Sequence, residues 1–282
     1  MVLFGPSGND ELFYEQGYKS SKEVFKWLRE MGLDLYEYSF GRGILLKDET
    51  AIEYAELAKE NNILVSVHAP YFINLANPDI EAIQKSFDYI DNSLNKLILL
   101  NGKKCVVHIG SCMKMTRNDA LKNVTYNLQK YMDSFDDNYG DKNIFVCPET
   151  MGKFQQIGTY KEIIDLCTLH KQLVPTLDFG HINCILQGNL SLDEYRKILD
   201  YMFEKLGDEK AKMVHVHFSK IEFSDKGEVR HLTLEEKKYG PNFEPLAFLL
   251  KEYKMDNVTI ISESKNIMAQ DAKKLKSIFY KN

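Results

Sequence analysis

Six short apolar runs of this chain each end in a residue that can bind a metal ion. The runs are rich in valine and isoleucine, and each is followed by a loop and a helical pattern. Parallel strands covered by helices on both faces need such continuous apolar runs. The six runs are Leu64–His68, Cys105–His108, Ile144–Glu149, Val174–Asp178, Met213–His217 and Thr259–Glu263. One histidine or aspartate at a strand end is usually a hydrogen-bonded core residue, but six in succession predict a polynuclear metal site where the strand ends meet.

The chain alternates strand and helix patterns over its whole length. Two further runs, Val2–Phe4 and Leu33–Tyr38, complete eight predicted strands. The predicted helices are Ser20–Met31, Glu49–Glu60, Ile80–Leu100, Asn118–Ser134, Thr159–His170, Leu192–Leu206, Phe243–Glu252 and Ala269–Phe279. Eight such units predict an α/β fold, the (β/α)8 TIM barrel. An open doubly wound sheet is the competing fold, but no glycine-rich phosphate loop follows an early strand. No Pro/Gly/Ser-rich linker interrupts the pattern, so we expect a single domain over residues 1–282.

Composition narrows the class of protein. A hydrophobic content of 44% with 27% charged residues is typical of a globular protein with a sizeable core. The five cysteines form no CxxC pair, and their odd number favours reduced thiols in the cytoplasm. The N-terminus shows no signal-peptide pattern, and no apolar stretch approaches the roughly 20 residues of a membrane span. We therefore expect a cytoplasmic protein, a monomer, with no membrane partner.

The barrel fold predicts where the candidate ligands meet. Active sites of TIM barrels lie at the C-terminal mouth, where the ends of different strands converge. Two more histidines follow strand ends closely: His181 comes three residues after Asp178, and His231 lies in the loop after the seventh strand. His215 and His217 share one face of that strand, but His217 is nearer the mouth and is the preferred ligand.

Basic residues also follow the strand ends. They are Arg42, Lys114, Arg117, Lys153, Lys220, Lys226, Arg230 and Lys265. Lysines are common in any exposed loop, so this arrangement supports a phosphate-containing substrate only weakly. The formal net charge of −5 argues mildly against a nucleic-acid partner, but bound divalent cations would offset the acidic ligands at the mouth.

The ordered motifs resemble those of a known family. The segments are His68-Ala-Pro-Tyr-Phe-Ile-Asn-Leu, Val107-His108-Ile-Gly-Ser, Val146-Cys-Pro-Glu149-Thr, Leu177-Asp178-Phe-Gly-His181, Val216-His217-Phe-Ser-Lys and Ile261-Ser-Glu263-Ser. In order and spacing they resemble endonuclease IV-type apurinic/apyrimidinic (AP) endonucleases, TIM barrels with a trinuclear zinc site in the xylose isomerase-like superfamily. The resemblance covers roughly residues 60–270 and implies cleavage of damaged duplex DNA 5′ to abasic sites in base excision repair.

The resemblance also implies a role for each matching residue. Its metal ligands would be His68, His108, Glu149, Asp178, His181, His217, His231 and Glu263. Glu149 would bridge two ions and is the catalytic carboxylate, and His181 with His231 would hold the third ion. Arg42 and Tyr71 match loop positions from which the family contacts DNA. Histidine ligands suit Zn2+, as two or three ions, and the mixed ligand set would also accept Mn2+ or iron.

One departure concerns the third ion. The family usually supplies an Asp-x-His pair after the seventh strand, whereas this chain has Val229-Arg230-His231. Glu228 or Asp225 could replace the missing aspartate, although neither has the family's spacing.

Two other functions fit part of the pattern. Sugar isomerases and epimerases of the same superfamily hold one divalent ion with Glu, Asp, His and Glu at strands five to eight, and Glu149, Asp178, His217 and Glu263 satisfy that set. A mononuclear isomerase has no need of the other four histidines at the mouth, which favours the nuclease. The missing aspartate gives some weight to a third possibility, a catalytically inactive barrel that binds metal or nucleic acid.

Overall fold

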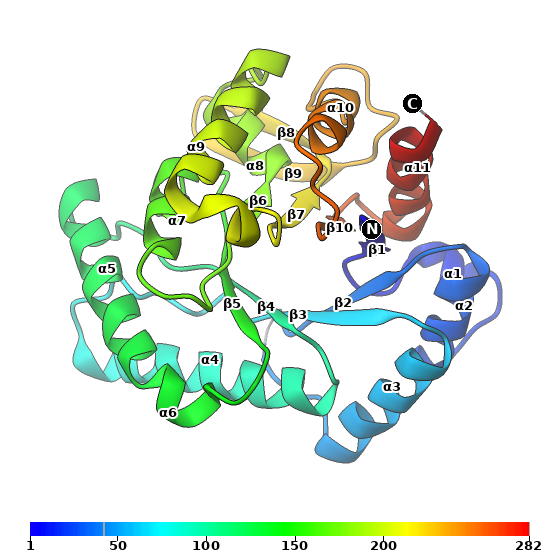
Figure 1. The fold of residues 1–282 in the computed structure, drawn as a ribbon, viewed down its shortest axis with the longest axis horizontal. Coiled ribbons are helices and arrows are strands. Elements are labelled where there is room, and N and C mark those ends of the chain that lie inside the picture. The colour runs from blue at the N-terminus through cyan, green and yellow to red at the C-terminus, as the bar shows by residue number, and fades with distance from the viewer. Residues whose placement is uncertain (42, 282) are drawn as a thin grey trace.

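The computed structural model describes residues 1–41 and 43–281, and within them eight parallel strands form a closed ring. They are β1 (Leu3–Pro6), β2 (Leu35–Ser39), β3 (Leu64–His68), β4 (Lys104–Val107), β5 (Phe145–Pro148), β6 (Thr176–Asp178), β7 (His215–Phe218) and β10 (Thr259–Ser262). Ladders join β2-β3-β4-β5 in one half and β6-β7-β10-β1 in the other (Figure 1). The parallel bridges Ser7–Glu37 and Glu149–Thr176 connect the halves. The predicted TIM barrel is confirmed.

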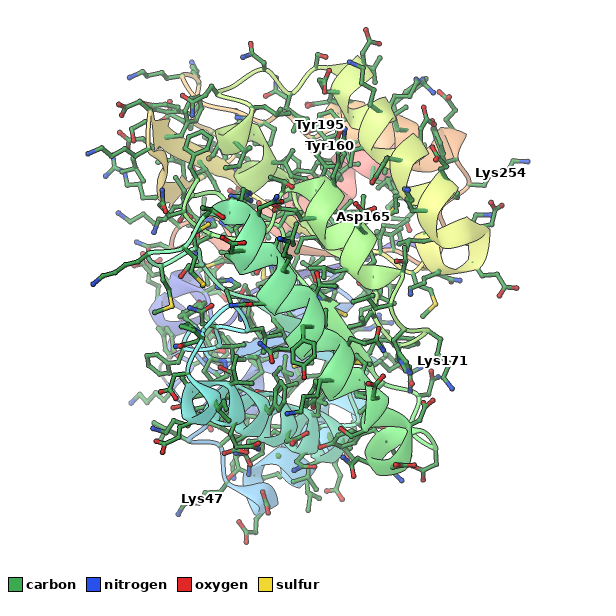
Figure 2. The ribbon with its side chains drawn as sticks, turned by 90° about the vertical axis from the view of Figure 1, so that its left-hand side faces the viewer. Lys47, Tyr160, Asp165, Lys171, Tyr195 and Lys254 are labelled. Carbon is green, nitrogen blue, oxygen red and sulfur yellow. The ribbon has the colours of Figure 1, made fainter. Side chains whose placement is uncertain are left out.

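Helices cover the outside of the strands, as the continuous apolar runs require. The longer ones are α2 (Val24–Glu30), α3 (Asp48–Glu60), α4 (Ile80–Leu99), α5 (Arg117–Asp133), α7 (Tyr160–Cys167), α9 (Leu192–Ala211), α10 (Glu244–Glu252) and α11 (Met268–Lys281). Figure 2 faces α5 and α7 from outside, with Tyr160 and Asp165 on α7. Tyr201 of α9 donates a hydrogen bond to Asp165 at 2.7 Å, which joins these neighbouring helices at the surface.

Helix boundaries follow local signals in the sequence. Ser191 caps α9 by accepting from the backbone N–H of Glu194, as its position predicts. Asn101 ends α4 with a φ of 53°, a left-handed conformation that asparagine tolerates. The predicted helix Leu192–Leu206 ends directly before Gly207, whose φ of 73° interrupts α9, and a second helical segment continues to Ala211. Short helices were not predicted: α1 (Glu11–Glu15), α6 (Phe135–Tyr139) and α8 (Phe179–Ile185).

A β-hairpin between β7 and α10 was also not predicted. Its strands are β8 (Lys220–Ser224) and β9 (Gly227–Leu232). The backbone N–H of Glu228 donates to the Gly152 carbonyl at 2.8 Å, which fastens the hairpin to the loop after β5. A Cβ at Gly227, where φ is +99°, would lie 2.3 Å from the same carbonyl oxygen. Glycine is therefore required for this close approach.

The N-terminal end of the barrel interior, opposite the mouth, holds a buried lysine. Lys104 begins β4, and its Nζ donates to the Met213 carbonyl at 2.6 Å and to Thr259 Oγ1 at 2.8 Å. Burial lowers the pKa of this ammonium from its ordinary 10.5 to about 8. At neutral pH the lysine is charged, and the folded state bears the cost of keeping that charge out of water.

We expect this lysine to make stability rise with pH. Between pH 8 and pH 10.5 the unfolded chain binds more protons at Lys104 than the folded chain does. The free energy of unfolding should therefore increase across that window, by at most roughly 1.4 kcal/mol per pH unit. Lys104→Met should flatten this dependence in urea titrations, whereas the exposed neighbour in Lys103→Met should leave it unchanged. Equal slopes in the wild type and Lys104→Met would contradict the assignment.

Candidate metal centre

Glu149 lies at the centre of the cluster at the barrel mouth. It follows β5, is 1% exposed, and faces histidines from three other strands. Its Oε2 atom lies 3.2 Å from Nε2 of His68 and 2.9 Å from Nε2 of His108. Its Oε1 atom lies 2.8 Å from Nδ1 of His217. The two oxygens of one carboxylate thus face two separate groups of imidazoles.

A second group surrounds Oε1 of Glu149. It consists of Glu149, Asp178, His217 and Glu263, whose ligand atoms all lie within 4.8 Å of one another. Asp178 Oδ1 accepts from the backbone N–H of His181 at 2.8 Å, but its buried Oδ2 atom has no hydrogen-bond partner among the described residues. A buried polar oxygen without a partner is costly. A cation between these carboxylates would remove that cost.

A third group joins the hairpin to the barrel. His181 at the start of α8 places Nε2 3.4 Å from Oε2 of Glu228, and Nε2 of His231 lies 3.7 Å from Oε1 of the same carboxylate. These three residues form a cluster with metal-ligand spacing. Of the two candidates for the aspartate that this chain lacks, Glu228 is therefore the one that lies beside both histidines. Asp225, the other candidate, sits in the hairpin turn and belongs to none of the clusters found among residues 1–41 and 43–281.

Backbone carbonyls fix the ring orientation of two of these histidines. Nδ1 of His68 lies 2.8 Å from the Ala69 carbonyl oxygen, and Nδ1 of His181 lies 2.9 Å from that of Thr150. A carbonyl only accepts, so Nδ1 must bear the proton in each ring. The Nε2 atom of each ring then points into the cluster, which is the orientation that a metal ligand needs.

The electrostatics of the cluster favour bound cations. Burial raises the pKa of the Glu149 carboxyl, but His217, His108 and His68 outweigh burial and hold that pKa well below its usual range. Burial raises the pKa of Asp178 to about 6. Burial lowers the pKa of His181, but the nearby carboxylates of Asp178 and Glu228 outweigh burial and raise that pKa to about 10. Without an ion, protons on the imidazoles must balance the carboxylates.

The mouth above the cluster is a cavity of about 420 Å³. Tyr71 borders it, with its ring centroid 5.3 Å from that of His68 and 5.2 Å from that of His108, and it remains 56% exposed. Lys153 and Gln156 line the wall on the side of the β5 loop. Arg42, the other predicted DNA contact, lies outside the described residues.

Two of the eight basic residues that follow the strand ends are already paired with carboxylates. Arg117 forms a two-point ion pair with Glu162, at 2.7 Å and 2.6 Å, and Arg230 pairs with Glu222 at 2.7 Å. These two guanidinium groups are already engaged by carboxylates. Lys153 lines the cavity directly, where it can meet an anionic substrate.

Sequence comparison finds relatives of two kinds. The profile of the xylose isomerase-like TIM barrel family matches residues 25–278. An uncharacterized protein of Methanocaldococcus jannaschii is 31% identical over 268 residues, 94% of this chain and 92% of that protein. A protein of Malacoplasma penetrans named probable endonuclease 4 is 28% identical over 231 residues, 77% of this chain and 75% of that protein.

Solved structures with the same fold include both enzyme types considered above. A D-tagatose 3-epimerase-like protein superposes with a TM-score of 0.69 at 24% identity, covering 88% of each chain. Endonuclease IV from Thermus thermophilus superposes with a TM-score of 0.67 at 19% identity, covering 94% of this chain and 97% of the other. At these identities the likeness establishes the fold alone. In the part of the chain that the structure describes, no helix is long and apolar enough to cross a membrane.

Proposed function

The chain belongs to the xylose isomerase-like TIM barrel family, and on that premise we propose that it is a metal-dependent AP endonuclease. Its substrate is damaged duplex DNA, which it incises 5′ to abasic sites in base excision repair. One observation carries this proposal: the four histidines beyond the epimerase set are not scattered. His68 and His108 face the second oxygen of Glu149, while His181 and His231 face Glu228. The donor atoms therefore fit three adjacent ions.

The proposed ligands divide among three positions. His68, His108 and Glu149 would hold the first ion, Glu149, Asp178, His217 and Glu263 would hold the second, and His181, Glu228 and His231 would hold the third. The imidazole-rich set suits Zn2+, with Mn2+ or iron as alternatives. Such ions, when bound, supply an activated water and polarise a phosphodiester.

The chain's own groups would position the substrate. Glu149 is suited to bridging because its two oxygens face different imidazole groups. Tyr71 presents an exposed aromatic ring beside His68 and His108, where it can stack against a base or fill the space left by an extruded nucleotide. Lys153 contributes positive charge to the cavity wall, where it can contact a phosphate oxygen. The role of Arg42 in DNA contact rests on its loop position alone.

A mononuclear sugar epimerase is the second candidate. It is favoured by the group of Glu149, Asp178, His217 and Glu263, which by itself would hold a single divalent ion. That function leaves the trio of His181, Glu228 and His231 unexplained. The trio lies on α8 and the β8–β9 hairpin, outside the eight barrel strands.

We also propose the cellular setting. The whole chain, residues 1–282, acts as one TIM-barrel domain, and it works as a monomer. The five buried cysteines, all free thiols, fit the reducing cytoplasm.

The decisive experiment is incision of an oligonucleotide duplex that carries one tetrahydrofuran abasic analogue. Protein loaded with Zn2+ or Mn2+ should cut 5′ to the analogue, and elemental analysis should find at least two transition-metal ions per chain. An undamaged duplex is the control for nonspecific nuclease. A single ion per chain together with epimerisation of a ketose would transfer the assignment to the epimerase class. Absence of incision by folded, metal-loaded protein would refute the nuclease.

A further inference from the structure

A line of buried polar residues runs through the barrel interior from its N-terminal end to the metal centre. Nζ of Lys104 donates to Thr259 Oγ1 at 2.8 Å, and that oxygen lies 2.6 Å from Nδ1 of His215. Nε2 of His215 lies 2.9 Å from Oε2 of Glu37. Oε1 of Glu37 lies 3.0 Å from Nε2 of His217. Glu37, His215 and His217 are fully buried, and Lys104 and Thr259 are each 8% exposed.

The chemistry of the first donor sets the direction of every bond in this line. An ammonium has only donors, so the Thr259 hydroxyl accepts from Lys104 and has one proton left to give. The ring of His215 is the remaining partner, so its Nδ1 accepts that proton and its Nε2 carries the ring's own hydrogen. Nε2 of His215 therefore donates to Glu37. In the opposite order the Thr259 hydroxyl would need another acceptor for its hydrogen, and no further hydrogen bond of this hydroxyl is found among the described residues.

Glu37 connects these hydrogen bonds to the metal centre. An ionised carboxylate only accepts, and its Oε2 already receives hydrogen bonds from His215 and from Ser66 Oγ, the latter at 2.8 Å. Its Oε1 lies 3.0 Å from Nε2 of His217 in an ion-pair contact, and neither atom has a hydrogen-bond partner among the described residues. A nitrogen lone pair facing a carboxylate oxygen at this distance would be repelled, so Nε2 of His217 bears a proton. Without an ion, the other nitrogen, Nδ1 of His217, donates to the Glu149 carboxylate, and a bound ion would replace that proton and use the Nδ1 lone pair. That atom lies 2.8 Å from Glu149 and 3.5 Å from Glu263, on the cluster side of the ring.

We propose that Glu37 is the positioning residue of the metal centre, holding His217 as an Nδ1 ligand through a proton order that begins at Lys104. A carboxylate behind a ligating imidazole fixes its tautomer and increases its basicity. The inference depends on the proposed function only through the metal ion that His217 would hold. It does not depend on the nature of the substrate.

Another arrangement of the same atoms is a cation bound between Glu37, His215 and His217, which have ligand-like spacing. Such an ion would need lone pairs on the Nε2 atoms of both rings. The order set by Lys104 and Thr259 places a hydrogen on Nε2 of His215, so a hydrogen-bonded network fits these contacts better than an ion does.

The test compares zinc affinity in Glu37→Gln and Ser66→Ala, measured by competition with a chromophoric chelator. Both substitutions remove a hydrogen bond at the same buried carboxylate, but only Glu37→Gln disturbs the group that faces His217. Glu37→Gln should weaken binding of the zinc ion that involves His217 by roughly tenfold to a hundredfold. Ser66→Ala should change it by less than about threefold, because it leaves the proton order intact.

Nitrogen-15 spectra of the histidine side chains provide a readout that a purely structural role would not move. In the zinc-loaded wild type, His217 should carry its proton on Nε2 with Nδ1 bound to zinc, and His215 should also carry its proton on Nε2. His215→Gln and His217→Gln assign the signals. This measurement needs no Glu37 variant, so it decides the inference even if Glu37→Gln fails to fold.

The outcomes separate this inference from the proposed function. A proton on Nδ1 of either histidine, or unchanged zinc affinity in a folded Glu37→Gln, would overturn the positioning role while leaving the nuclease assignment standing. Loss of one whole zinc equivalent in both Glu37→Gln and His215→Gln would overturn it in favour of Glu37 as a ligand. A wild type that takes up none of Zn2+, Mn2+ or iron would refute the proposed function and the positioning role together.

Discussion

Glu149→Gln is expected to abolish incision and to lower the metal content of the protein. The amide offers one acceptor oxygen where the carboxylate offers two, so it cannot face His68 and His108 on one side and His217 on the other as a bridging ligand. The incision rate should fall by roughly a thousandfold or more, on the order of 4 kcal/mol in the activation free energy. Single-turnover cleavage of the abasic duplex and elemental analysis of the purified variant measure both effects.

A second variant and a folding control test whether the effect of Glu149→Gln is specific. Glu149→Asp keeps both oxygens but shortens the side chain, so it should retain more metal and more activity than Glu149→Gln. Thermal unfolding of the metal-free proteins should show that each variant folds, since Glu149 follows the end of β5 and packs against other mouth residues. A Glu149→Gln protein with full metal loading and a nearly normal rate would exclude the bridging role.

Glu228→Ala is expected to remove one metal ion and to slow turnover, with little effect on DNA binding. The Glu228 carboxylate joins His181 and His231 from the hairpin. The other two groups lie at or just after the ends of barrel strands and should keep their ions. An ion that acts mainly in the transition state affects kcat more than KM. We expect kcat to fall by roughly a hundredfold, about 2.7 kcal/mol, with KM within a few-fold of the wild type.

The hairpin supplies matched controls for this prediction. Glu222→Ala removes a carboxylate from the same hairpin, but one that pairs with exposed Arg230, so activity should remain near the wild-type level. Adding Val229→Asp to Glu228→Ala restores the family's Asp-x-His spacing without restoring the ion. The reason is that Val229 is the extra residue of a β-bulge, which breaks the alternation, so Glu228 and His231 share a face while Val229 is 54% exposed. Recovery of metal and rate in that double variant would contradict the role of Glu228.

The barrel could be predicted because its signal is local and repeated. A strand buried on both faces must be apolar throughout, and runs such as Leu64–His68 show this directly. Their order along the chain then determines which ends meet, since parallel strands of one barrel all end at the same mouth. The convergence of His68, His108 and His217 on Glu149 follows from that rule. Their role as ligands remains a prediction.

The hairpin and the roles of Glu228 and Glu37 were harder to predict, each for a different physical reason. The segment from Lys220 to Leu232 carries charge on most of its exposed positions. Its sequence therefore resembles that of a polar loop, although it forms two strands. Glu228 reaches His181 only because the hairpin folds back onto Gly152. Glu37 sits between two tyrosines in β2. A lone charge within an apolar strand was the available signal, but its partners His215 and His217 lie nearly 180 residues away.

The attachment of the hairpin also bears on how such proteins are recognised from sequence. Glu228 and His231 lie on or beside the hairpin between β7 and α10, outside the eight barrel strands, so a change in its length or residue spacing need not alter those strands. A search pattern that demands aspartate two positions before the histidine would discard this chain. A criterion based on whether a carboxylate oxygen lies within reach of both imidazoles would retain it. For members of the family with divergent hairpins, spatial position is the safer basis for grouping.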